Sequence, residues 1–145
     1  MKTDNDNIFG KVVFAYTRAQ AIEDGVLVDV TKTANDAGFK WSTAVTRAVF
    51  DRYIAVPEDL VGQQDESGRT WDLLWMLWVS VRTGKINGDR GEFKLLVHFP
   101  ESADWQSNEA TQIEDATLRL VTLKSVSGPG DKGEPTITIM LPTED

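Results

Sequence analysis

The 145-residue sequence contains no cysteine. This absence excludes disulfide frameworks, thiolate zinc sites, iron–sulfur clusters and cysteine nucleophiles together. His98 is the only histidine, so a single chain cannot supply a multi-histidine metal site. The sequence also lacks a phosphate-binding glycine loop, a nucleophile elbow and a dinucleotide fingerprint. We therefore expect no bound metal and no cofactor, and we assign no residue a catalytic role.

Long apolar runs and an excess of basic residues are also missing. The longest apolar stretch, residues 73–79, is far shorter than the roughly 20 residues that span a bilayer. Residues 1–7 contain no apolar run of the signal-peptide type, so we expect a cytoplasmic protein. With 15 basic against 23 acidic residues, the formal net charge is −8. This charge disfavours direct binding to nucleic acid or to an anionic membrane.

What is present fits a single α+β domain. Hydrophobic residues make up 41% of the chain and charged residues 26%, close to the averages of globular proteins. Helical signals dominate residues 8–84 and strand signals dominate residues 92–142, with no internal repeat or linker between them. We therefore expect one domain over residues 1–145, with residues 1–7 as a loose N-terminal tail.

Several short elements are expected before residue 57. Hydroxyl side chains favour helix starts because they accept a hydrogen bond from a main-chain N–H, and glycine or proline favours helix ends. The expected elements are a helix over 18–24 between Thr17 and Gly25, a strand over 26–30, a helix over 32–37 between Thr31 and Gly38, and a longer helix from Ser42 or Thr43 to Pro57.

The strongest helical signal covers residues 68–82. Trp71, Trp75 and Trp78 lie on one stripe, and other apolar residues cover most of the remaining directions. A helix that is apolar almost all round is normally buried, so we expect these tryptophans in the core. Trp41 and Trp105 lie near loop edges and are expected to be exposed.

The second half predicts an antiparallel sheet of three or more strands packed on the tryptophan-rich helix. Apolar and polar residues alternate over 93–99, as in a half-buried strand. Further strands are expected over 116–126 and 136–141, joined by a hairpin loop over 127–135. An acidic loop is expected over 101–115.

Two segments of the first half are the most distinctive in the chain: YTRAQAIEDGVLVDV over residues 16–30 and DESGRTWDLLWM over residues 65–76. Both resemble blocks of a family of small uncharacterised proteins, a domain of unknown function met mainly on bacterial phages, plasmids and integrative elements. The resemblance covers about residues 8–82. It implies a genomic setting and no biochemical activity.

Two groups of charged residues in this half are candidate binding residues. Arg18 could hold a phosphate or carboxylate and Asp24 could act as a base or metal ligand, although a solvated helix face explains both. The second group could form a carboxylate–arginine site beside an aromatic wall, although carboxylates at a helix start are also favoured by the helix dipole. This group comprises Asp65, Glu66, Arg69 and Asp72.

Residues 57–66 and 101–115 are dense in acids and contain no lysine or arginine. Such loops could meet a cationic partner surface, and electrostatic complementarity favours fast, selective association. The candidate contact residues there are Glu101, Asp104, Trp105 and Glu109.

These features favour a non-enzymatic acidic binding protein from a mobile element. We expect it to modulate or inhibit a host defence or nucleic-acid-handling complex by contact with a protein that has a basic surface. One alternative is a structural or regulatory protein that assembles with itself or with another element-encoded protein. The other is a small enzyme that processes a nucleotide or nucleic acid with arginines and carboxylates.

Overall fold

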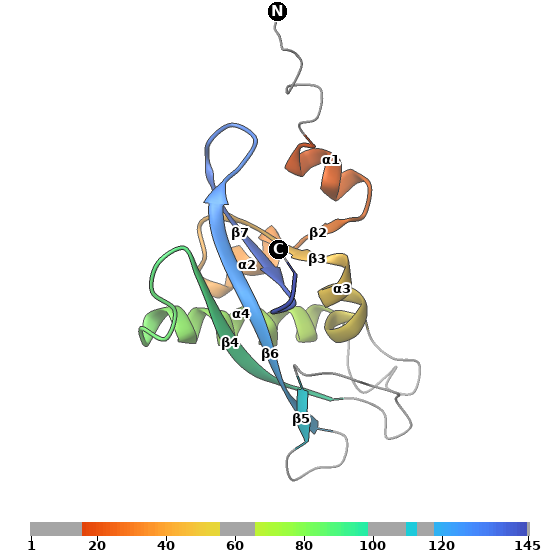
Figure 1. Cartoon of the computed structure of the whole chain (residues 1–145), viewed down its shortest axis with the longest axis vertical. Helices are drawn as coiled ribbons and strands as arrows, with labels where there is room; N and C mark the ends of the chain where they lie inside the picture. Colours follow the sequence, from red (N-terminus) through yellow and green to blue (C-terminus); the bar gives the residue numbers. More distant parts are fainter. Residues whose placement is uncertain (1–15, 56–65, 99–109, 113–117, 145) are drawn as a thin grey trace, which may run out of the picture.

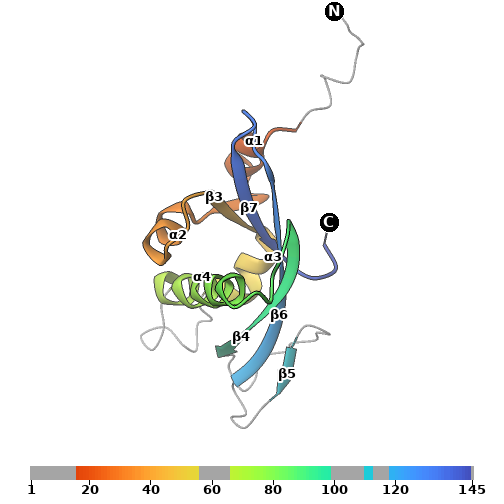
Figure 2. The same ribbon diagram turned by 90° about the vertical axis from the view of Figure 1, so that its left-hand side faces the viewer.

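The computed structural model describes residues 16–55, 66–98, 110–112 and 118–144 (Figure 1). The α+β class is confirmed: α2 and α4 lie on one side of a single sheet, which forms the second layer (Figure 2). The helical elements are α1 (Arg18–Glu23), α2 (Thr31–Ala37), α3 (Arg47–Val49), the π-helix η2 (Phe50–Ile54) and α4 (Glu66–Arg82). None of the described helices combines the length and apolar character that crossing a membrane requires.

The sheet has six strands in the order β2-β3-β7-β6-β4, with β5 paired to β6. Its strands are β2 (Leu27–Asp29), β3 (Ser42–Thr46), β4 (Arg90–His98), β5 (Ala110–Gln112), β6 (Leu118–Pro129) and β7 (Pro135–Met140). The antiparallel strands expected in the C-terminal half are confirmed as β4, β6 and β7. The sheet also recruits β2 and β3, and β3 runs parallel to β7.

The prediction of a helix that starts at Ser42 or Thr43 is wrong, because this segment forms strand β3. Thr43 and Val45 are β-branched, and both are buried between β2 and β7. Pairing on both sides of the strand outweighs the capping potential of a hydroxyl. The helix begins instead at Arg47, where the Thr46 hydroxyl accepts a hydrogen bond from the Val49 N–H at 3.3 Å.

Helix α1 begins at the expected residue and ends at Glu23, one residue before the expected end, with Asp24 as its C-cap. The Thr17 hydroxyl accepts from the Gln20 N–H, and the Gln20 side chain accepts from the Thr17 N–H, which makes a capping box. Gly25 follows with a φ of +80°.

Helix α2 begins differently from the expectation. Its N-cap is Val30, while the Thr31 hydroxyl donates to the Asp29 carboxylate at 2.5 Å and accepts from the Thr43 N–H at 3.0 Å. Thr31 therefore ties the helix start to β3. The expected C-terminal glycine is confirmed, with Gly38 at a φ of +114°.

The core lies between α4 and the helix-facing side of the sheet. Leu73, Leu74 and Leu77 of α4 are at most 1% exposed. They belong to one buried cluster with alternate residues of the strands, which share a face because side chains alternate along a strand. The strand residues are Val45, Phe93, Leu95, Val121, Leu123 and Ile139.

Two expectations for the C-terminal half need adjustment. The β6–β7 hairpin remains paired as far as Pro129 and Pro135, so its loop is shorter than 127–135. The short strand β5 falls inside the expected acidic loop 101–115 and pairs with the N-terminal part of β6.

The expected tail, residues 1–7, lies outside the described residues.

Candidate functional site

Helix α4 exposes the tryptophans that were expected to be buried. Trp71 is 38% exposed and Trp75 is 42% exposed, and Trp78 is half-buried. The expectation was wrong because the leucines of α4 occupy the side that meets the sheet. In a two-layer arrangement the opposite side of the helix has no second layer among the described residues.

The tryptophans form an ordered stack along α4. The ring centroids of Trp71 and Trp75 are 6.0 Å apart with an interplanar angle of 12°, and those of Trp75 and Trp78 are 5.1 Å apart at 13°. The Arg82 guanidinium lies 4.6 Å from the Trp78 ring centroid, a cation–π contact that ends the row. We call Trp71, Trp75 and Trp78 the tryptophan stack.

Arg69 anchors the helix that carries the stack. It is 6% exposed and donates a hydrogen bond to the main-chain carbonyl of Tyr53, in η2, at 3.2 Å. Burial lowers the pKa of its guanidinium. Arg69, a candidate binding residue from the sequence, therefore lies in the interior. Of the other candidates near it, Glu66 is exposed in the first turn of α4 and Asp65 lies outside the described residues.

Arg18 and Asp24 lie elsewhere, around α1. The Arg18 guanidinium donates to the Thr138 hydroxyl and to the Ile137 carbonyl, both at 2.7 Å, and so docks α1 on β7. Asp24 accepts a hydrogen bond from the Tyr16 hydroxyl at 2.7 Å. In Figures 1 and 2, α1 lies on the far side of β2 and β3 from α4, so the structure does not bring these two residues together with Arg69.

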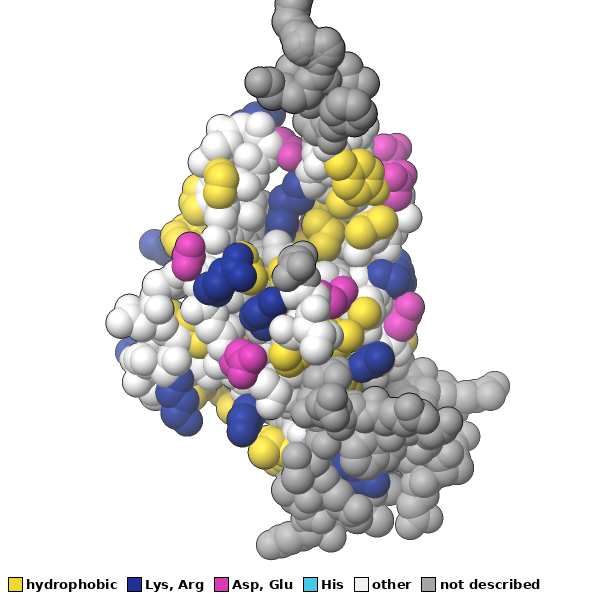
Figure 3. Space-filling model, viewed as in Figure 1, with side chains coloured by type: hydrophobic (Ala, Val, Ile, Leu, Met, Phe, Trp, Pro, Cys, Tyr) yellow, Lys and Arg dark blue, Asp and Glu magenta, His cyan; other side chains and the backbone are white. Residues whose placement is uncertain are grey.

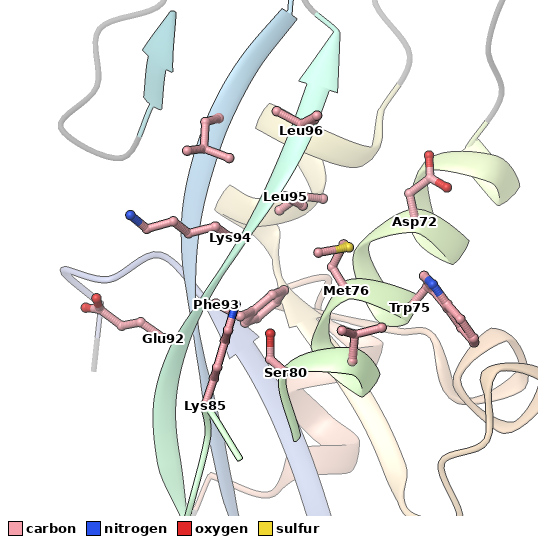
Figure 4. Close-up of a pocket in the computed structure, with 12 residues that line it drawn as sticks. Asp72, Trp75, Met76, Ser80, Lys85, Glu92, Phe93, Lys94, Leu95 and Leu96 are labelled. Carbon is pink, nitrogen blue, oxygen red and sulfur yellow. The ribbon is translucent and has the colours of Figure 1, made fainter. Parts of the chain in front are cut away.

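A first hollow lies between α4 and the edge strand β4, with a volume of about 680 Å³ (Figure 4). Trp75 and Met76 form its helical wall, and Phe93 and Leu95 contribute from β4. Its lining includes charges of both signs, namely the carboxyls of Asp72 and Glu92 and the amines of Lys85 and Lys94. Burial raises the pKa of the Asp72 carboxyl.

A second hollow, of about 570 Å³, lies at the C-terminal end of α4 against the turn between α2 and β3. Three aromatic side chains line it: Phe39, Trp41 and Trp78. Trp41 is 43% exposed, as the sequence predicted. The charged lining residues are Lys40 and Arg82, with no carboxylate among the lining residues. Sequence reasoning missed this site, since its residues come from segments far apart in the chain.

Among the described residues, the sheet face opposite the helices carries a mixture of side chains. Figure 3 shows Lys and Arg side chains intermingled with Asp and Glu on this face. Within the described residues, no group of three or more His, Asp or Glu side chains could hold a metal ion. His98 ends β4 in register with Leu118. The candidates Glu101, Asp104, Trp105 and Glu109 lie outside the described residues.

The fold and the tryptophan stack define a two-layer α+β domain with an exposed aromatic helix. A comparison with protein families matches residues 5–145 to the Family of unknown function (DUF6573), and the chain belongs to this family. The match extends the resemblance seen over residues 8–82 to nearly the whole chain. Searches of the curated proteins and of the solved structures found no match.

Proposed function

We propose that this is a non-enzymatic binding protein, encoded on a mobile element, that modulates or inhibits a host defence or nucleic-acid-handling complex by protein–protein contact. The tryptophan stack is its contact surface. The observation that supports this proposal is the exposure of Trp71 and Trp75, because tryptophan dominates binding hot spots and is costly to leave in water.

The surroundings of the stack favour a partner that presents lysine or arginine. Asp72 lies on α4 between Trp71 and Trp75, and partial burial raises the pKa of its carboxyl. A partner cation would offset this desolvation. Within the chain itself, the Arg82 guanidinium packs on the indole ring of Trp78, as a guanidinium of the partner would pack on the stack. The net charge of −8 would steer a basic surface toward the protein.

The test measures the affinity for a partner captured from host lysate and then purified. Trp71→Ala combined with Trp75→Ala should weaken binding at least tenfold, mainly through faster dissociation. Tyr16→Ala combined with Val26→Ala is the matched control, since it removes similarly exposed apolar area near α1. Equal affinity of wild type and the tryptophan double variant would refute the proposal. If the captured partner is a second copy of this chain, sedimentation should show self-association. That outcome would favour the alternative of a structural or regulatory protein that assembles with itself.

A second variant separates the acidic segments from the stack. Lysine at positions 101, 104 and 109, in place of Glu101, Asp104 and Glu109, changes the net charge from −8 to −2. Exposed charges act chiefly through steering that salt screens, so association should slow and its salt dependence should flatten. Dissociation should change little. Unaltered association kinetics at low salt would exclude these three residues from recognition.

A further inference from the structure

We propose that the second hollow binds a nucleotide, that is, a planar base that carries a phosphate. The hollow shares only Trp78 with the tryptophan stack, and the proposal does not depend on the protein–protein contact proposed above. It concerns binding alone and requires no catalytic step.

The hollow has the size and rigidity of a small-molecule site. Its volume of about 570 Å³ falls within the range of about 300–1,000 Å³ typical of ligand pockets. Ser125 of β6 and Ile137 of β7 contribute from the sheet, and Leu77 of α4 adds a fully buried side chain. These residues belong to paired strands and a packed helix, so this part of the site is formed before a ligand arrives.

The aromatic side chains provide surfaces for a base. Trp78 has its two ring faces against Trp75 and Arg82, so it serves as a wall. Trp41 is 43% exposed and offers a stacking surface at the rim. The side of the Arg82 guanidinium that faces away from Trp78 offers a second planar surface. Nucleic-acid bases stack on aromatic rings and on guanidinium groups alike.

The charge of the hollow fits a phosphate. Lys40 and Arg82 line it, and no ion pair joins either of them to a carboxylate within the part of the chain that is described. This local excess of positive charge occurs in a chain whose acidic residues outnumber its basic ones by 23 to 15. Charge-assisted hydrogen bonds to phosphate oxygens are stronger than neutral ones. Asn87 and Ser127 add hydrogen-bonding groups for a sugar or a base edge.

One nucleotide unit could be free or could be the end of a single strand. The chemistry at the hollow is the same for both sources. The net charge of −8 disfavours binding along an extended nucleic-acid backbone, since such binding depends on many phosphate contacts.

The experiment is isothermal titration calorimetry of the full chain. The probes are the four ribonucleoside 5′-monophosphates, their nucleosides, inorganic phosphate, and a 5′-phosphorylated hexadeoxynucleotide. We expect at least one monophosphate to bind with 1:1 stoichiometry and at least tenfold more tightly than its nucleoside or inorganic phosphate. The hexanucleotide separates the sources: tighter binding in competition with the monophosphate indicates a strand end, and weaker binding indicates a free nucleotide.

Three substitutions locate the binding. Trp41→Ala, Arg82→Gln and Lys40→Gln should each weaken the monophosphate at least tenfold, whereas Lys85→Gln, which lies at the first hollow, should leave it unchanged. All four side chains are exposed, and circular dichroism checks the fold of each variant. Absence of saturable nucleotide binding at millimolar concentrations, equal binding of inorganic phosphate, or binding that these variants leave intact would overturn the proposal. So would binding of an acidic aromatic peptide but of none of the nucleotides.

Discussion

Leu74 and Trp75 are neighbours on α4, yet one is 0% exposed and the other is 42% exposed. The leucine contributes its whole side chain to the core, whereas the tryptophan contributes mainly its contacts within the stack. Under the proposed function, stability and recognition are divided between adjacent residues of one helix.

This division predicts the ranking of two alanine substitutions. Leu74→Ala should lower the free energy of unfolding by about 2–5 kcal/mol, the range for fully buried leucines. Trp75→Ala should lower the free energy of unfolding by less, because the Trp75 side chain is already partly exposed. Each stacking contact with a neighbouring ring contributes only about 0.5–1.5 kcal/mol beyond the area that it buries. Urea denaturation of both variants measures the difference. A larger loss for Trp75→Ala would mean that the stack serves the fold rather than a partner.

At this scale the sequence predicts position better than burial. Helical spacing correctly places Trp71, Trp75 and Trp78 on one stripe. It does not say which side of α4 meets the sheet, because leucine and tryptophan are both apolar and either stripe could be covered. The exposure of Trp41 was predicted correctly, because Trp41 is not part of a periodic apolar pattern.

At the scale of elements, the contact between α2 and α4 depends on Gly38. Its φ of +114° is a conformation that side chains rarely adopt, and a β-carbon there would lie 2.7 Å from the Trp78 Nε1. The end of α2 therefore has to be glycine for two separate reasons, backbone conformation and the approach of an indole ring.

Gly38→Ala and Gly84→Ala separate these two reasons. Gly84 also has a positive φ, of +80°, but a β-carbon there would meet nothing within 4 Å. We expect Gly84→Ala to cost about 1–2 kcal/mol from the backbone alone. Gly38→Ala should cost more and should shift the indole N–H resonance of Trp78. Equal losses in thermal melts of the two variants would show that the ring moves aside freely.

Element boundaries were predictable where a local residue sets them and not where a distant strand does. Thr17 and Gly25 bound α1 through contacts within a few residues. Ser42–Thr46 is a strand because β2 and β7 pair with it, and β7 lies at the other end of the chain. The second hollow escaped prediction for the same reason, since α4, β6 and β7 meet there only after folding.

At the scale of the whole molecule, the tip of the β6–β7 hairpin holds the first turn of α1. The Asp131 carboxylate accepts hydrogen bonds from the N–H groups of Arg18 and Ala19, at 2.7 Å and 3.0 Å. These two hydrogen bonds, Arg18 first, lower the pKa of the Asp131 carboxyl. The hairpin tip thus acts as a cap for a helix more than a hundred residues away in sequence.

The lowered pKa predicts how this attachment responds to acid. A carboxyl whose folded pKa lies below the unfolded value of about 3.9 contributes fully above pH 3.9, and its contribution is lost as the pH falls through the lower folded value. The amide resonance of Ala19 should therefore titrate with a midpoint below about 3.9. Asp131→Asn should remove this titration while the rest of the fold persists. A midpoint at or above the ordinary value would show that the carboxylate is not held by these N–H groups.

The position of β7 has a consequence for the order in which the protein can take shape during synthesis. β7 joins β3 on one side and β6 on the other, yet it is translated after every other described strand. Without β7 the remaining strands can pair only as two separate fragments, β2 with β3 and β4 with β6, and the edges that β7 joins have no partner. Unpaired strand edges invite association with other chains. The two halves of the sheet can therefore join only after β7 has been translated, which places the closing step of the fold in the last residues of the described chain.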